Sequence, residues 1–209
     1  MQEIVLSDGA KTVVRKLTEK GYKAYAVGGC VRDLLRGKTP DDYAMATSAF
    51  PEEVAEVFSA YDVIPTGLKH GTVTVVIDKI PYEITTFRKD GDYLDGRRPD
   101  KVEFVDDVKE DLSRRDFTVN AMAYNDDEGL IDPFGGEQDL KNKILRCVGD
   151  PEKRFTEDAL RILRAARFCS TLSLTVEEET ARKAVKLAYK LKNVSAERIF
   201  AEVNKLLLG

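Results

Sequence analysis

The sequence has 209 residues, of which 43% are apolar and 33% are charged, so it can bury a core in one large domain or in a domain with a smaller appendage. It has no apolar run of about 18 residues and no basic-then-apolar leader, which excludes membrane roles and makes the cytoplasm the expected location. The net charge of −4 argues against indiscriminate coating of nucleic acid but is compatible with a local basic cleft.

The first two thirds of the chain are predicted to mix helices and strands. The helix predicted first has Ala10, Val13, Val14 and Leu17 on one face and Gly21 as its stop signal. Periodicity and turn residues predict these elements in order: a helix at 7–20, a strand at 23–27, a short helix at 31–37, a strand at 42–46, a helix at 51–58, a hairpin of strands 72–77 and 81–87, a mobile polar loop at 88–100, and further strand and turn at 101–105 and 121–134.

From about Pro151 onwards nearly everything is predicted to be helical. The expected helix starts are Thr156, a capping box of Thr175 with Glu178, and Ser195. We therefore predict one domain at 1–150 and a helical region at 151–209. The apolar run before the last residue is typical of a fragment of something longer, or of a surface that awaits a partner.

Cysteine and histidine usage limits the chemistry. Cys30, Cys147 and Cys169 are far apart and lack CxxC spacing, which favours reduced thiols over a disulfide framework or a zinc site. His70 is the only histidine, and its place before an apolar strand favours a turn residue over the base of a catalytic triad.

The stretch PDDYAMATSA, at 40–49, raises the question of a metal site. Residues 42 and 44 share one face of the predicted strand, where two carboxylates could hold two Mg²⁺ ions, but only Asp42 is acidic because residue 44 is Ala44. Glu83 lies on a strand face opposite Tyr82 and is a candidate further metal carboxylate. A polar strand entry and a surface acid on a hairpin are the alternative interpretations.

Two segments are candidate phosphate contacts. Gly28 and Gly29 let the backbone approach an anion closely, and Arg32 adds positive charge in the first turn of the following helix. The segment RRDFTVNAM at 114–122 offers Arg115 to a phosphate. A simple turn and surface ion pairing are the alternatives.

The segment RFTEDALRILRAARF, at 154–168, predicts a helix with a base-reading face. Asp158 and Arg161 are neighbours at spacing i, i+3, and Arg164 and Arg167 continue the same stripe. A carboxylate accepts from the exocyclic amino group of cytosine or adenine, while the neighbouring guanidinium donates to the ring; uracil and guanine present a carbonyl oxygen instead. Salt bridges in the first helical turn are the alternative.

These motifs, taken together and in order, resemble the class II (bacterial-type) tRNA nucleotidyltransferases, which are the CCA-adding enzymes and their poly(A) polymerase relatives. The resemblance covers essentially the whole chain and rests on the segments GGCVRDLLRG, PDDYAMATSA, GTVTVV, YEITTFR, DLSRRDFTVNAMAY, DPFGG and RFTEDALRILRAARF. It implies an α+β fold, with a polymerase beta-like nucleotidyltransferase head on a small mixed sheet followed by an all-helical neck.

The resemblance also implies roles for individual residues. Asp42 would hold Mg²⁺ and Glu83 would be a further acid of a two-metal site; CTP and ATP would be the substrates and the tRNA 3′ end the acceptor. Phosphates would contact Gly28, Gly29, Arg32 and Arg115. The base would be read by Asp158 and Arg161, supported by Arg164 and Arg167.

Two departures from the family pattern qualify this expectation. Ala44 stands where the family has a second aspartate, so we expect an inactive engineered variant, with a natural pseudoenzyme as the alternative. Family members continue into further helical domains that hold tRNA, so we expect a truncated neck and an incomplete tRNA grip. Homo-oligomerisation is left open.

Within the family, the loop FRKDGDYLDGRRP and the stretch SAYDVIPTGLKHGTVTVV favour CCA or A addition. Poly(A) synthesis is the alternative enzyme. Because of Ala44, a nucleotide-binding module without catalysis is the alternative from a different class.

Overall fold

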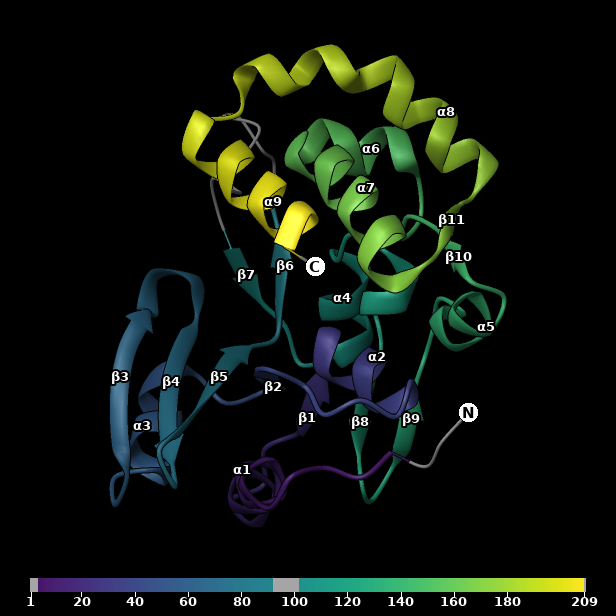
Figure 1. The fold of residues 1–209 in the computed structure, drawn as a ribbon. Coiled ribbons are helices and arrows are strands. Elements are labelled where there is room, and N and C mark those ends of the chain that lie inside the picture. Colours follow the sequence, from purple (N-terminus) through teal and green to yellow (C-terminus); the bar gives the residue numbers. More distant parts are fainter. Residues whose placement is uncertain (1–3, 92–101, 209) are drawn as a thin grey trace.

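A mixed sheet organises the first part of the chain in the computed structural model, which describes residues 4–91 and 102–208 (Figure 1). Within those residues seven strands join in one sheet, in which β2 and β5 are parallel and the other neighbours are antiparallel. The spatial order is β3 (Asp62–Gly67), β4 (Thr72–Ile77), β5 (Ile80–Thr86), β2 (Tyr43–Thr47), β1 (Ala24–Val27), β8 (Ala123–Asn125) and β9 (Gly129–Ile131). The predicted mixed sheet is confirmed.

Helices α1 (Asp8–Glu19) and α3 (Pro51–Val57) pack on one face of this sheet. The Ser7 hydroxyl caps α1 by accepting from the amide of Ala10, and the predicted apolar stripe of α1 is fully buried. The same core contains Tyr43 and Met45 from β2 and Tyr82 and Ile84 from β5. Residues 44 and 83 therefore belong to the opposite face, as strand alternation predicts, whereas residue 42 precedes the strand.

The opposite face of the sheet carries α4 (Val108–Ser113). Helix α2 (Gly29–Leu35), which ends before Gly37, packs through Cys30, Val31 and Leu35 in the same core as α1 and α3. The prediction of a loop at 88–100 is wrong for residues 88–90, because they form strand β6 (Arg88–Asp90), which pairs with β7 (Val102–Phe104). The rest of that loop, residues 92–100, lies outside the described residues. The predicted hairpin is confirmed, and its turn is formed by Asp78 and Lys79, both at positive φ. His70 ends the 3-10 turn η1 (Leu68–His70), as expected for a turn residue.

The region after Pro151 is mostly helical, and its helices gather at one end of the molecule (Figure 1). They are α6 (Pro151–Glu157), α7 (Leu160–Leu172), α8 (Glu178–Leu187) and α9 (Ala196–Leu208), with the 3-10 segment η3 (Ala188–Asn193) between α8 and α9. The helix α9 packs against α7. None of the helices in the described part of the chain is long and apolar enough to cross a bilayer.

The helix starts differ from two of the three predictions. Asp150, rather than Thr156, caps α6, because its side chain accepts from the amide of Glu152. Thr175 does not form a capping box, because it lies in the short strand β11 (Thr175–Val176), which pairs with β10 (Ile144–Leu145). Glu177 caps α8 instead. Ser195 directly precedes α9, as predicted.

Candidate functional site

A pocket of about 550 Å³ opens between α2, the start of β2 and the helices α7 and α9. The described residues that line it are Gly29, Arg32, Asp42, Ala44, Arg114, Arg115, Asp116, Asn120, Asp158, Leu160, Arg161, Arg164, Arg167, Phe168, Arg198 and Lys205. Among these described residues, seven arginines and one lysine face three aspartates, which leaves a surplus of five positive charges. Such a surplus favours a polyanionic ligand.

Most of the residues singled out from the sequence line this single pocket. They are Gly29, Arg32, Asp42, Ala44, Arg115, Asp158, Arg161, Arg164 and Arg167. Gly28 and Glu83 are not among the lining residues. Each is nevertheless adjacent to one that is, since Gly28 precedes Gly29 and Glu83 pairs with Ala44 across the parallel strands.

The candidate metal carboxylates come from the start of β2 and from β5. Asp42 is exposed and lies in a bend just before β2, whereas Glu83 is the register partner of Ala44. Among the described residues no group of three or more histidine, cysteine, aspartate or glutamate side chains is arranged to hold a metal ion. Ala44 places a methyl group rather than a carboxylate at the register partner of Glu83, so two carboxylates remain, and these donors do not fit a two-ion site.

Gly28 brings the end of β1 close to Arg115. Its backbone has φ 76° and ψ −127°, which a residue with a side chain rarely adopts, and a Cβ at this position would lie 2.6 Å from Arg115 Nη1. The Arg115 Nη2 atom donates to the buried carboxylate of Asp111 at 3.3 Å. Glycine at position 28 therefore leaves room for the Arg115 guanidinium at the pocket.

Buried side chains connect the sheet side of the pocket to the helical side. Arg32 is held by both carboxylate oxygens of Asp33 and donates to Asn120 Oδ1 at 2.6 Å. The Asn120 amide in turn donates to Asp116 Oδ1 at 3.2 Å. Asp116 Oδ2 accepts from both Nε and Nη2 of Arg164, at 2.8 and 2.6 Å.

The ionisation of this network is fixed by its geometry. Burial opposes the charge of Asp116, but the ion pair with Arg164 and the hydrogen bond from Asn120 outweigh it and lower the pKa of Asp116 to about 2. The Asp116 carboxylate also raises the pKa of Arg164. Both groups are therefore charged at neutral pH, and the Arg164 guanidinium is held in one orientation.

The prediction of one continuous helix over 154–168 is wrong, because the chain breaks at Asp158. This residue ends α6 with extended backbone angles (φ −148°, ψ 106°), and its Oδ1 atom accepts from the amide of Leu160 at the start of α7. Its Oδ2 atom accepts from Arg198 Nη2 at 2.6 Å. Asp158 therefore pairs with an arginine of α9, which lies 40 residues further along the chain.

Arg161 is held mainly from α6 and α4. Its Nη1 atom donates to Glu157 Oε2 at 2.7 Å and to the carbonyl of Arg154, while Nη2 donates to the carbonyl of Arg114. Asp158 and Arg161 thus line the same pocket on separately anchored side chains, rather than on successive positions of one helical face.

Sequence analysis did not single out Phe168, Arg198, Glu202 or Lys205. The ring of Phe168 lies 4.1 Å from the guanidinium carbon of Arg167, and Arg32 and Arg164 approach it at 5.4 and 5.3 Å. Glu202 is only 6% exposed, and its Oε2 atom accepts from Arg167 Nε at 2.7 Å. No local motif links α9 to α7, so the sequence does not specify these contacts; the only related signal is the high content of charged residues in α9.

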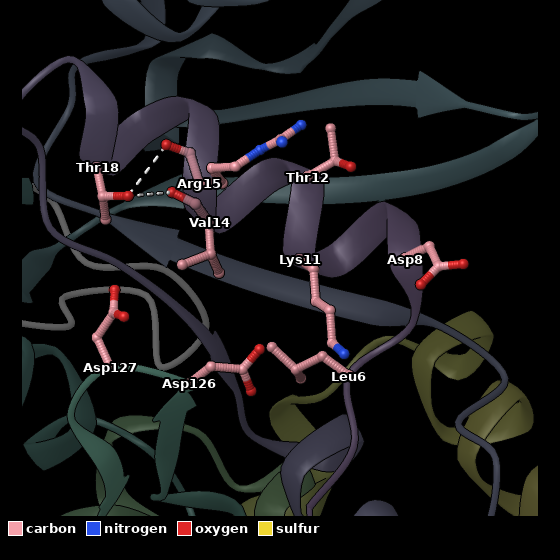
Figure 2. A pocket seen from close by; sticks show the side chains of 9 residues that line it. All are labelled: Leu6, Asp8, Lys11, Thr12, Val14, Arg15, Thr18, Asp126 and Asp127. Carbon is pink, nitrogen blue, oxygen red and sulfur yellow. Dashed lines mark hydrogen bonds between the residues drawn. The ribbon is translucent and has the colours of Figure 1, made fainter.

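Another cavity, of about 420 Å³, lies between α1 and the turn that joins β8 to β9 (Figure 2). Lys11 and Arg15 line it together with Asp8, Asp126 and Asp127, so its described charged residues sum to −1. The Thr18 hydroxyl donates to the carbonyls of Val14 and Arg15 and is already satisfied. This cavity is poorly suited to a polyanion, which distinguishes it from the arginine-rich pocket.

Comparison with known proteins agrees with the fold. Residues 24–146 match the poly A polymerase head domain, and residues 173–209 match a segment described as the probable RNA and SrmB-binding site of polymerase A. A CCA-adding enzyme from Leuconostoc mesenteroides is 49% identical over 200 residues, which are 96% of this chain and 49% of the relative. One from Lactobacillus delbrueckii is 52% identical, over 96% of this chain and 50% of the relative.

Solved structures give the same result. The CCA-adding enzyme of Bacillus stearothermophilus in complex with CTP has a TM-score of 0.88 and 46% identity, over 96% of this chain and 48% of that one. The Thermotoga maritima CCA-adding enzyme complexed with tRNA has a TM-score of 0.80 and 28% identity, over 98% and 48%. The chain spans about half the length of the relatives it matches. With the head-domain match extending over residues 24–146, the chain belongs to the poly A polymerase head domain family.

Proposed function

We propose that this chain is the head and helical neck of a CCA-adding tRNA nucleotidyltransferase, with the head at 1–150 and the neck at 151–209. It binds CTP and ATP, and the tRNA 3′ end is the acceptor of the transferred nucleotides. The observation that carries the proposal is the pocket of about 550 Å³ in which a surplus of arginines lies beside Asp158. A nucleoside triphosphate needs both, because it presents a polyanion at one end and a hydrogen-bonding base edge at the other.

The phosphates are assigned to the sheet side of the pocket. Gly28 and Gly29 leave the backbone open to close approach, and Arg32 and Arg115 supply positive charge. Asp33 and Asn120 hold Arg32 in place, so its guanidinium loses little freedom when an anion binds.

The base is assigned to the helical side. Asp158 accepts from the exocyclic amino group of cytosine or adenine, and Arg161 donates to the ring of the same base. Arg164 and Arg167, whose guanidinium groups lie over the ring of Phe168, support the two readers from the next turns of α7. Uracil and guanine place a carbonyl oxygen against the Asp158 carboxylate and are disfavoured.

Ala44 leads us to propose that nucleotide binding persists while transfer is nearly abolished. Asp42 and Glu83 are the only two of the expected carboxylates that the sequence retains. Because this donor set does not fit two Mg²⁺ ions, no transfer step is assigned to the chain with alanine at position 44.

Poly(A) or A-only addition is the second candidate, favoured by the poly A polymerase description of the matching head domain. The two candidates differ in the base that they accept. A CCA-adding site binds CTP and ATP with similar affinity, whereas an A-only site prefers ATP.

Calorimetric titration with CTP, ATP, UTP and GTP tests the proposal on the chain as it stands. We expect CTP and ATP to bind alike, and UTP and GTP to bind more weakly by roughly 1–3 kcal/mol for each mismatched polar contact. Asp158→Ala should erase this preference, whereas Arg32→Ala should weaken all four nucleotides alike. If Asp158→Ala still prefers CTP and ATP, Asp158 has only a structural role and the base-reading assignment is wrong.

A further inference from the structure

The helix α9 carries three charged residues at spacing i, i+4 and i+7, two of which line the pocket. Arg198 and Lys205 line the pocket, and Glu202 lies between them, buried against Arg167. Residues at this spacing share one helical face. Helix α9 packs against α7 (Figure 1), and its lining residues Arg198 and Lys205 complete the pocket wall next to the residues to which we assign the base.

Arg198 fixes the carboxylate of Asp158. The Leu160 amide holds Oδ1 at 3.0 Å and Arg198 Nη2 holds Oδ2 at 2.6 Å, so the two contacts together restrict rotation of the carboxylate. The Asp158 side chain is 15% exposed and that of Arg198 is 22% exposed. Each carboxylate oxygen has a second lone pair, which leaves acceptor capacity for a ligand amino group.

Glu202 fixes the arginine stripe of α7. It accepts from Arg167 Nε at 2.7 Å and lies 3.6 Å from Arg164 Nη1. A carboxylate buried to this degree is stable only when it is paired, and these two arginines are its partners. The pairing holds the guanidinium carbon of Arg167 over the Phe168 ring, 4.1 Å from its centroid.

We propose that Arg198 and Glu202 are positioning residues that set base selection without contacting the base themselves. Arg198 holds the Asp158 carboxylate in the orientation that accepts an amino group, and Glu202 keeps Arg164 and Arg167 from turning into the space of the base. The proposal deepens the proposed function and rests on it. If the Asp158 carboxylate were free to rotate, it could turn away from the carbonyl oxygen of uracil or guanine. Discrimination between CTP and UTP would then fall further than the affinity for CTP.

The test compares Arg198→Met, Arg198→Lys and Lys205→Met in the chain as it stands, by titration with CTP and UTP. We expect Arg198→Met to lower the ratio of the UTP and CTP dissociation constants about tenfold, and Arg198→Lys to keep most of it. Lys205→Met is the matched control, because it removes the same charge from the same face of α9. It should weaken both nucleotides by the same factor and leave their ratio unchanged.

Glu202→Gln keeps the shape of the side chain but replaces the ion pairs with Arg164 and Arg167 by at most a weaker neutral hydrogen bond, so the two guanidinium groups are held less firmly. If Glu202 acted only through its charge, removing that charge would tighten binding of all four nucleotides and leave the ratio of the UTP and CTP dissociation constants unchanged. That result would overturn the assignment of Glu202 as a positioning residue. We expect the ratio to fall instead. Should Arg198→Met fail to fold by circular dichroism, Arg198→Lys and Glu202→Gln carry the comparison.

The outcomes separate this inference from the proposed function. A wild-type chain that binds all four nucleotides equally refutes base selection, and the positioning roles with it. A wild-type chain that prefers CTP, together with an Arg198→Met variant that keeps the full ratio at lower stability, refutes the positioning role alone.

Discussion

Ala44→Asp is expected to convert this chain into one whose stability responds to Mg²⁺. Ala44 is the register partner of Glu83 on the neighbouring parallel strand, and Asp42 lies two residues earlier, in the bend before β2. Side chains at paired positions have Cβ atoms about 5 Å apart, so the new carboxylate would face that of Glu83.

The magnitude follows from this spacing. Two like charges about 5 Å apart repel by roughly 3 kcal/mol at an effective dielectric constant of about 20 and by about 1 kcal/mol in water. Because Glu83 is exposed, the lower value applies, and without metal the variant should lose about 1 kcal/mol of stability. An ion that binds only the folded state, at a hundredfold excess over its dissociation constant, returns about 2.7 kcal/mol.

Urea unfolding in EDTA and in excess Mg²⁺ measures both effects. We expect Ala44→Asp to be less stable than the starting chain in EDTA and more stable in Mg²⁺, while Ala44→Asn, the neutral matched variant, changes little between the two. In a chain extended by the downstream region that relatives carry, transfer of labelled CMP and AMP should rise by roughly three decades or more. A Mg²⁺ response no larger in Ala44→Asp than in Ala44→Asn would refute the shared-face argument.

Three further predictions concern the pocket and its partners. The pKa of Asp116 is lowered to about 2, so the stability from its pair with Arg164 is present above about pH 4 and lost as the pH falls through 2. In urea unfolding, Asp116→Asn should therefore cost about 2 kcal/mol of stability at pH 6 and little at pH 2. An equal cost at both pH values would contradict the pairing. Gly28→Ala should lower stability by about 1–3 kcal/mol and weaken nucleotide binding by displacing Arg115, whereas Gly129→Ala, at positive φ in open space, should leave binding intact; unchanged binding in Gly28→Ala would count against the close approach. The net charge of −4 predicts weak tRNA binding in filter assays, and tight, salt-sensitive binding would contradict it.

Local signals in the sequence predicted the elements that depend on local interactions. The apolar stripe that ends at Leu17 located α1, and the helix stop signal at Gly37 located the end of α2. Both signals act within a few residues, because one is helical periodicity and the other is a glycine at positive φ. Strand β6 was missed, since its pairing with β7 is a contact between distant segments. The Thr175 cap failed for the same reason, because pairing of β11 with β10 places the residue in a strand.

The candidate site was predictable to the extent that its residues lie in compact motifs. The segments around Arg32, Arg115 and Asp158 were identified separately, and the fold brings them into one pocket. The break at Asp158 was not predictable from helical periodicity, because it depends on a side chain that bonds to its own backbone and on Arg198 from a distant helix. The contacts of Glu202 were likewise invisible, since nothing local specifies how α9 packs on α7.

The charge distribution explains how so many arginines can share one pocket. Arg32, Arg164 and Arg167 surround a single ring, that of Phe168, and would repel one another if left unpaired. Each is held by an acid from a different part of the chain; these acids are Asp33 in α2, Asp116 after α4 and Glu202 in α9. The acids cancel most of the repulsion and fix the guanidinium groups, while the further arginines of the pocket keep its surplus positive. A ligand therefore meets cations that are already oriented, and binding costs little additional ordering of these side chains.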